Sequence, residues 1–191
     1  MNIELFKRVL SSLILGPLAI FLIISGSFLF VFFLLICFFI TFYEWHLMSK
    51  KKSYNIYGII FMIFSFYSVY KLRFSFDESY VYLLFTTIIC ISTDIGGYIF
   101  GKIFKGPKLT KISPNKTYSG VIGSFTVSLI GGLIFLGYIP DALFWSYFDG
   151  YEQIGVGYNL FILLIILIIS LISQLGDLII SYFKRAAKIK D

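Results

Sequence analysis

The chain has 191 residues, of which 59% are hydrophobic and only 14% are charged, and its formal net charge is +6. So few charged residues exclude an ordinary soluble domain, because a globule of this size exposes much of its chain to water. The lysines and arginines fall between long apolar runs and form no basic face, which argues against nucleic acid as a partner and favours a membrane protein.

Six apolar runs follow one another along the chain. A helix that spans a bilayer needs about 20 mostly apolar residues, and its backbone groups must bond within the segment. The predicted spans are Val9–Ile24, Phe28–Tyr43, Ile56–Tyr70, Tyr80–Phe100, Gly120–Ile139 and Leu160–Tyr182. The sequence therefore predicts an all-α, polytopic transmembrane bundle of about six helices, which forms a single integral membrane domain over residues 1–191.

The connections between these runs alternate in charge. Fourteen of the sixteen basic residues lie before the first run, after the second, between the fourth and fifth, and after the sixth. The other connections hold only Lys71 and Arg73, together with acidic residues such as Asp77 and Asp149. Because basic connections stay in the cytoplasm, we expect both termini there, with the protein in the inner (plasma) membrane.

The last apolar run carries a polar stripe on one helical face. Ser170, Ser173, Asp177, Ser181 and Lys184 recur at intervals of three and four residues. A carboxylate is costly in lipid, so we expect Asp177 to face the protein interior or a wet cavity near the cytoplasmic surface. The alternative is a polar seam that only holds helices together.

The fourth run contains a second acid, Asp94. It shares a helical face with Thr86, Cys90, Gly97 and Gly101, and this face is small and polar. Small residues allow another helix or a ligand to approach the backbone closely. Helix packing alone would explain the glycines, but it explains Asp94 less well.

The basic connection after the fourth run has the composition of a phosphate site. Ser113, Lys116 and Thr117 come just before the fifth run, where free backbone N–H groups at a helix start favour an anion. The glycine spacing of a P-loop is absent. Lysines such as Lys108 and Lys111 would also suit topology or anionic lipid head groups, and this alternative stays open.

Four motifs stand in order along the second half of the chain. They are Asp-Ile-Gly-Gly-Tyr-Ile-Phe-Gly-Lys at 94–102, Ser-Pro-Asn-Lys-Thr-Tyr-Ser-Gly at 113–120, Ser-Gln-Leu-Gly-Asp-Leu at 173–178, and Ser-Tyr-Phe-Lys-Arg at 181–185, followed four residues later by Lys190-Asp191. These motifs resemble those of the phosphatidate cytidylyltransferase (CDP-diacylglycerol synthase) family, and the resemblance runs from about Glu44 to the last residue.

The resemblance implies an activity and a set of site residues. Family members condense CTP with phosphatidic acid in the membrane and depend on a divalent metal, usually Mg²⁺, with a second metal possible. By this resemblance Asp177 is the expected metal ligand and catalytic acid. The other expected site residues are Asp94, Lys184 and Arg185 for catalysis, and Lys108, Lys111, Ser113, Lys116 and Thr117 for substrate binding.

The resemblance also predicts a shortened chain. In the family, the Lys-Asp pair is followed by a glycine-containing turn, a His-Gly-Gly element, an Asp-Arg element and a last apolar helix, whereas this chain stops at Asp191. We therefore expect the C-terminal part of the family domain to be missing and the activity of the chain alone to be impaired. Three alternatives stay open: a CTP-dependent polyprenol kinase, a non-catalytic membrane subunit or remnant, and, more weakly, a transporter. A homodimer is also possible.

Overall fold

The structure is a computed structural model that describes residues 3–50, 52, 54–74, 80–110, 113, 116–138 and 155–187. In these residues the chain forms six α-helices and no β-strand, apart from an isolated bridge between Lys108 and Thr117. The helices are α1 (Ile3–Ser25), α2 (Ser27–Ser49), α3 (Asn55–Phe74), α4 (Tyr80–Phe104), α5 (Tyr118–Tyr138) and α7 (Gly155–Ala186). The prediction of an all-α bundle of about six helices is confirmed.

The helices extend past the ends of the predicted spans. Helix α3 continues to Phe74 and α4 to Phe104, four residues beyond each predicted end, and α7 continues to Ala186. Basic residues lie in these last turns, where a long side chain can leave the apolar region and place its charge in water. Apolarity alone therefore underestimates helix length. The predicted end of the fifth span, Ile139, lies outside the described residues.

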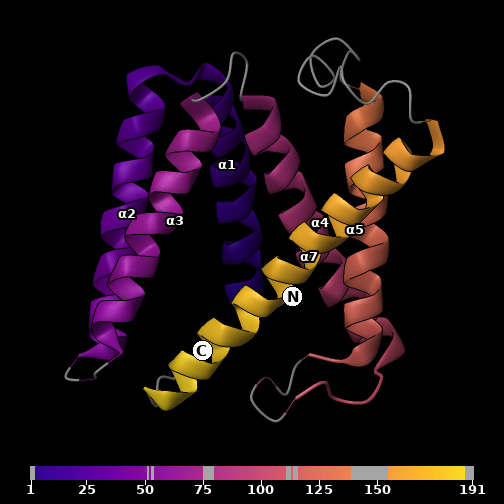
Figure 1. The fold of residues 1–191 in the computed structure, drawn as a ribbon. Coiled ribbons are helices and arrows are strands. Elements are labelled where there is room, and N and C mark those ends of the chain that lie inside the picture. The colour runs from indigo at the N-terminus through magenta and orange to yellow at the C-terminus, as the bar shows by residue number, and fades with distance from the viewer. Residues whose placement is uncertain are drawn as a thin grey trace. The chain divides into compact units, whose positions relative to one another are not determined.

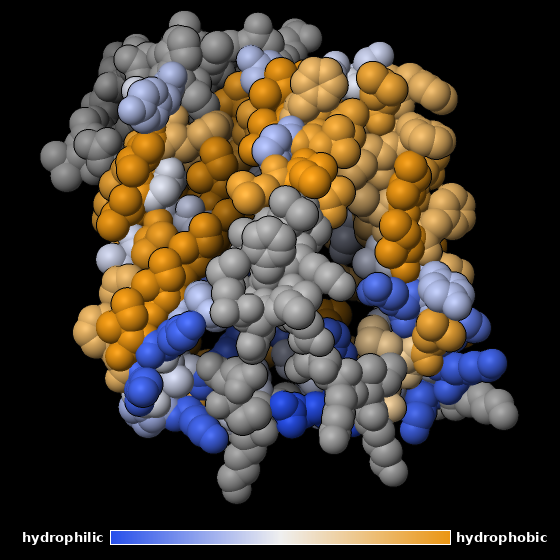
Figure 2. All heavy atoms as spheres, turned by 180° about the vertical axis from the view of Figure 1, so that it is seen from behind, coloured by the Kyte–Doolittle hydropathy of each residue, from blue (hydrophilic) through white to orange (hydrophobic). Residues whose placement is uncertain are grey.

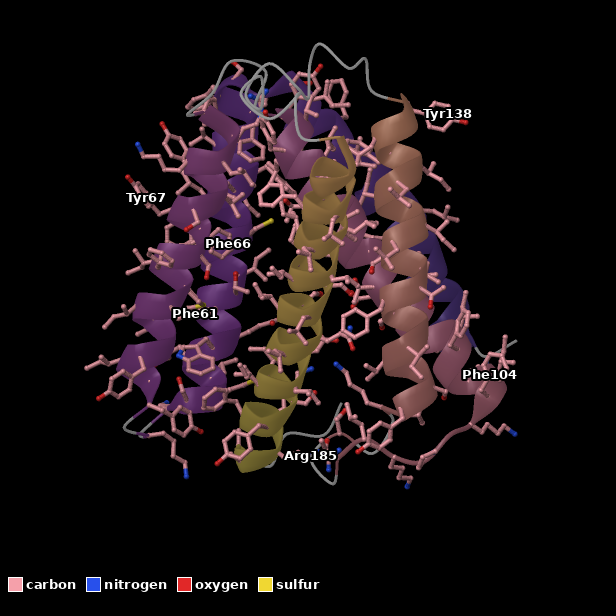
Figure 3. All side chains as sticks on the ribbon, turned by 45° about the vertical axis from the view of Figure 1, so that its right-hand side comes forward. Phe61, Phe66, Tyr67, Phe104, Tyr138 and Arg185 are labelled. Atoms are coloured by element: carbon pink, nitrogen blue, oxygen red, sulfur yellow. The ribbon has the colours of Figure 1, made fainter. Side chains whose placement is uncertain are left out.

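The outer surface of the helices is apolar. Five of them, α2, α3, α4, α5 and the part Leu160–Ala186 of α7, are long and apolar enough to cross a membrane, and Leu13–Ser25 of α1 is a shorter apolar stretch. In Figure 2, orange apolar side chains cover much of the face formed by the described residues and blue hydrophilic ones gather at its lower edge, and Tyr67 and Tyr138 point away from the helices in Figure 3. Such a surface requires lipid rather than water around it, so the chain is a multi-pass membrane protein.

Residues 1–84 form one compact unit. Helices α1, α2 and α3 run side by side in it, coloured indigo to purple in Figure 1. The turn between α1 and α2 is made by Gly26, whose φ of 58° suits glycine. Arg73 of α3 donates hydrogen bonds to the carbonyl oxygens of Ile23 (2.8 Å) and Ile24 (3.2 Å). Arg73 therefore has a local structural role, because it satisfies carbonyl groups in the last turn of α1.

Residues 85–191 form the second compact unit, which contains most of α4 together with α5 and α7. Helices α4 and α5 approach closely through glycines: a Cβ atom added to Gly120 would lie 2.9 Å from the carbonyl oxygen of Gly97. Helix α7 runs obliquely across α5 in Figure 1, and Gly132 of α5 packs against Ile166 of α7. The small residues predicted in the fourth run therefore pack against another helix. The division into two units leaves the single membrane domain a prediction.

Candidate functional site

Buried hydroxyl groups connect the three helices of the second unit. The hydroxyl of Ser124 on α5 donates to the carbonyl oxygen of Thr93 on α4 at 2.8 Å. The Thr93 hydroxyl is hydrogen-bonded to that of Ser170 on α7, at 2.9 Å. All three side chains are buried, and Ser170 is completely inaccessible. Because these polar groups are satisfied only when the helices keep their positions, they fix α7 against α4.

A cavity of about 280 Å³ lies beside this hydroxyl network. Its lining includes five of the residues predicted from the sequence, which come from α4, α7 and the connection between α4 and α5. They are Asp94, Ser113, Lys116, Thr117 and Asp177. The structure therefore brings together two carboxylates, a lysine and two hydroxyls that are spread over 84 positions of the sequence.

An ion pair connects the basic connection to α7 within this cavity. Lys116 Nζ lies 3.1 Å from Asp177 Oδ2 and donates a second hydrogen bond to the carbonyl oxygen of Gln174 at 3.3 Å. The Lys116 side chain is 26% exposed and that of Asp177 is 57% exposed. Asp94 also lines the cavity and is exposed to it. The cavity therefore holds two acids and one base, all accessible to a ligand.

The segment before α5 is held in a tight turn. The backbone N–H of Leu109 donates to the Lys116 carbonyl oxygen at 2.8 Å, and the N–H of Lys116 donates to that of Ser113 at 3.1 Å. Thr117 caps α5, since its hydroxyl accepts a hydrogen bond from the N–H of Gly120 at 3.1 Å. Because the Gly120 N–H already donates to Thr117, it is not available to a phosphate. A phosphate bound here would instead be held by Lys116 and Ser113.

The remaining predicted residues lie elsewhere. Lys184 and Arg185 are in the last turn of α7, about two helical turns beyond Asp177, and do not line the cavity. Figure 3 shows Arg185 at this end of the helix. Lys108 forms the isolated bridge with Thr117 and is exposed. Lys111 lies outside the described residues.

Four polar side chains of the cavity lining were not predicted as site residues from the sequence: Thr93, Tyr98, Ser124 and Gln174. A signal existed for two of them. Thr93 directly precedes Asp94, and Gln174 lies three residues before Asp177, on nearly the same helical face. Nothing in the sequence distinguishes Ser124 from the other hydroxyls of the fifth run.

The donor set fits a magnesium ion that is shared with a phosphorylated substrate. No group of three or more His, Cys, Asp and Glu side chains occurs among the described residues, so an all-protein metal cage is not found there. Mg²⁺ needs only one or two carboxylates when phosphate oxygens and water complete its octahedral shell. Asp94 and Asp177 in one open cavity meet this requirement.

Comparisons with known proteins identify the family of the chain. The model of a family described as "Cytidylyltransferase family" matches residues 6–76 and 55–191. A Staphylococcus aureus (strain COL) phosphatidate cytidylyltransferase is 40% identical over 136 residues, which cover 70% of this chain and 44% of that protein. A Rickettsia conorii protein of the same name is 30% identical over 191 residues, covering 98% of this chain and 79% of that protein.

A Brucella suis protein, also named phosphatidate cytidylyltransferase, is 31% identical over 135 residues, which again cover 70% of this chain and 44% of the relative. The chain thus spans less than half the length of the Staphylococcus and Brucella relatives. No solved structure is similar to it at a significant level.

Proposed function

This chain belongs to the cytidylyltransferase family, and on that premise we propose that it transfers the cytidylyl group of CTP to phosphatidic acid. The products are CDP-diacylglycerol and pyrophosphate. The observation that supports this proposal most directly is the cavity in which Asp94 and Asp177 meet Lys116. The two carboxylates could bind a metal ion, and the lysine could bind phosphate. Both are needed in the proposed reaction, because its two substrates are polyanions that repel each other.

In the proposed reaction, a phosphate oxygen of phosphatidic acid attacks the α-phosphorus of CTP. A new P–O bond forms, the bond to the β-phosphate oxygen breaks, and pyrophosphate leaves with the electron pair. Magnesium held by Asp177, with Asp94 nearby, would supply positive charge to the phosphates. Lys116 would bind the nucleotide phosphates, and the Ser113 hydroxyl would orient them, so that repulsion between the substrates is reduced.

The last turn of α7 suits the lipid substrate. Phosphatidic acid carries its phosphate at the membrane surface, where Lys184 and Arg185 end the helix that bears Asp177. Cations in the last helical turn also interact favourably with the helix dipole and attract anionic lipid. We therefore propose that Lys184 and Arg185 gather the lipid near the cavity, and that the inner membrane presents this side to cytoplasmic CTP.

The activity is tested by supplying labelled CTP, phosphatidic acid and Mg²⁺ to the purified chain in lipid. The same assay is run on the chain extended with the C-terminal segment of the Rickettsia conorii relative, since this chain covers 79% of that protein. We expect CDP-diacylglycerol and pyrophosphate in equal amounts from the extended chain. In a parallel assay with polyprenol in place of phosphatidic acid, formation of CDP and a polyprenyl phosphate would instead identify a kinase. No product in either form would favour a non-catalytic subunit.

The orientation is tested by labelling single cysteines in spheroplasts, in a background without Cys37 and Cys90. Cysteines placed at Lys50, Lys111 and Lys188 should react only after permeabilisation, because positive connections stay inside. Cysteines at Asp77 and Asp149 should react from outside. Labelling of position 111 in sealed spheroplasts would contradict both the orientation and the access of cytoplasmic CTP.

A further inference from the structure

Lys116 forms an ion pair with Asp177, the carboxylate that would hold the metal in the proposed function. Its ammonium group lies between Asp177 Oδ2 at 3.1 Å and the Gln174 carbonyl oxygen at 3.3 Å. We propose that Lys116 is a placeholder cation: it neutralises Asp177 when the cavity is without ligands, and it must leave before a divalent cation binds. Metal and nucleotide then bind together, and metal alone binds weakly. This inference rests on the proposed function and adds to it an order of binding.

The local structure allows Lys116 to exchange partners without a change of fold. Its backbone is fixed by the hydrogen bonds to Ser113 and from Leu109, and by the cap that Thr117 provides to α5. Its side chain is a flexible four-carbon stem that ends in a compact charge. The ammonium group can therefore turn from Asp177 to another acceptor in the cavity while the backbone stays in place.

Electrostatics opposes simultaneous occupation of Asp177 by both cations. A divalent ion on this carboxylate would lie within a few ångströms of the ammonium group, and like charges that close repel strongly at a partly buried site. If Lys116 left without a new acceptor, its charge would lose both hydrogen bonds. Asp94 lines the same cavity, but it would itself be drawn toward the divalent ion.

The phosphates of the nucleotide remove this conflict, because they give the ammonium group a new anionic partner. The nucleotide therefore strengthens metal binding, and by linkage the metal strengthens nucleotide binding by the same factor. Free divalent ions in the cell would then leave the vacant cavity largely unoccupied, and the metal would enter as its complex with the nucleotide.

The test measures metal binding alone, without nucleotide or lipid substrate. Mn²⁺ is titrated against the chain in nanodiscs, and bound ion is measured by electron paramagnetic resonance. We expect weak binding to the unaltered chain and binding tighter on the order of tenfold for Lys116→Met, which removes one nearby like charge and keeps an unbranched, flexible side chain that is one atom shorter. In Lys116→Met combined with Asp177→Asn the gain should disappear, because the freed carboxylate is gone.

Lys102→Met is the matched control. It removes the same charge from the second unit, but the Lys102 ammonium lies over the ring of Tyr98, and it contacts no carboxylate of the residues that the structure describes. Its affinity for Mn²⁺ should equal that of the unaltered chain. Circular dichroism and size-exclusion profiles check each variant, and Lys116→Gln replaces Lys116→Met if the latter does not fold.

Three results would overturn the inference. The first is that the Lys116 variants bind Mn²⁺ no more tightly than Lys102→Met. The second is tight binding by the unaltered chain, equal to that of the variants. The third is absence of binding in every variant. None of these measurements uses the reaction, so the inference can fail while CDP-diacylglycerol synthesis stands. A chain that shows the expected metal binding but forms no CDP-diacylglycerol would contradict the proposed function alone.

Discussion

In the chain extended with the C-terminal segment of the Rickettsia conorii relative, Asp177→Asn is expected to reduce the turnover of CDP-diacylglycerol synthesis on the order of a thousandfold, as the loss of a metal ligand would. Asparagine keeps the size and hydrogen-bonding capacity of aspartate but removes its charge. The structural cost should be small, because Asp177 is 57% exposed and a pair of this kind contributes about 0–1 kcal/mol. A large loss of turnover would therefore report on chemistry and not on folding.

The measurement is the rate as a function of CTP and Mg²⁺ concentration, with the melting temperature recorded for each variant. The rate in Asp177→Asn should also need more Mg²⁺ to saturate. Gly176→Ala is the matched control, because a Cβ atom at this neighbouring position would meet nothing within 4 Å. Near-normal turnover in a folded Asp177→Asn variant would remove this residue from the metal site and leave it as part of a polar seam.

The polar stripe of the last apolar run shows what periodicity can predict. The intervals of three and four residues correctly place Ser170 and Asp177 on one face of α7. In the structure, the two residues of this face lie in different environments. Ser170 is buried and hydrogen-bonded to Thr93, whereas Asp177 lines the open cavity. Ser170 therefore belongs to a polar seam between helices, as the packing interpretation predicts, and Asp177 belongs to the candidate site. The spacing of the residues alone cannot show where the one part of the stripe ends and the other begins.

The pairs that build the site could not be predicted from the sequence. Lys116 and Asp177 are separated by 61 positions, and Thr93 and Ser170 by 77. Apolar runs and helical periodicity identify the faces that avoid lipid, but the angle and register at which helices cross depend on side-chain packing. Charge alone also could not show that Lys116, and not Lys108, lines the cavity. The hydrogen bond between Leu109 and Lys116 closes a turn just before the cap of α5, and this turn sets the position of Lys116.

The crossing of α4 and α5 explains why glycines accompany Asp94 in the fourth run. A Cβ atom added to Gly96 would collide with the carbonyl oxygen of Gly123 and would lie 2.9 Å from the Val127 Cβ atom. The first of these neighbours is backbone, so no rotation of a side chain can relieve the collision. Even a methyl group at this position must push the two helices apart.

Gly96→Ala is therefore expected to destabilise the second unit by about 1–3 kcal/mol, the usual cost of overpacking, or by more if the helices separate fully. Separation would also break the hydrogen bond between Ser124 and Thr93, which joins α5 to α4 beside the cavity. Metal and nucleotide binding should weaken together with stability. Thermal unfolding in detergent, followed by circular dichroism, measures the first effect, and Mn²⁺ titration with CTP measures the second.

Gly137→Ala is the control for this prediction, since it introduces the same methyl group in α5 where no atom lies within 4 Å. Alanine is the better helix former, by about 0.5–1 kcal/mol, so this variant should melt at the same temperature as the unaltered chain or slightly above it. The two variants should thus shift stability in opposite directions or by clearly different amounts. If Gly96→Ala and Gly137→Ala melted at equal temperatures, α4 and α5 could separate without cost. The glycines near Asp94 would then make room for something other than α5.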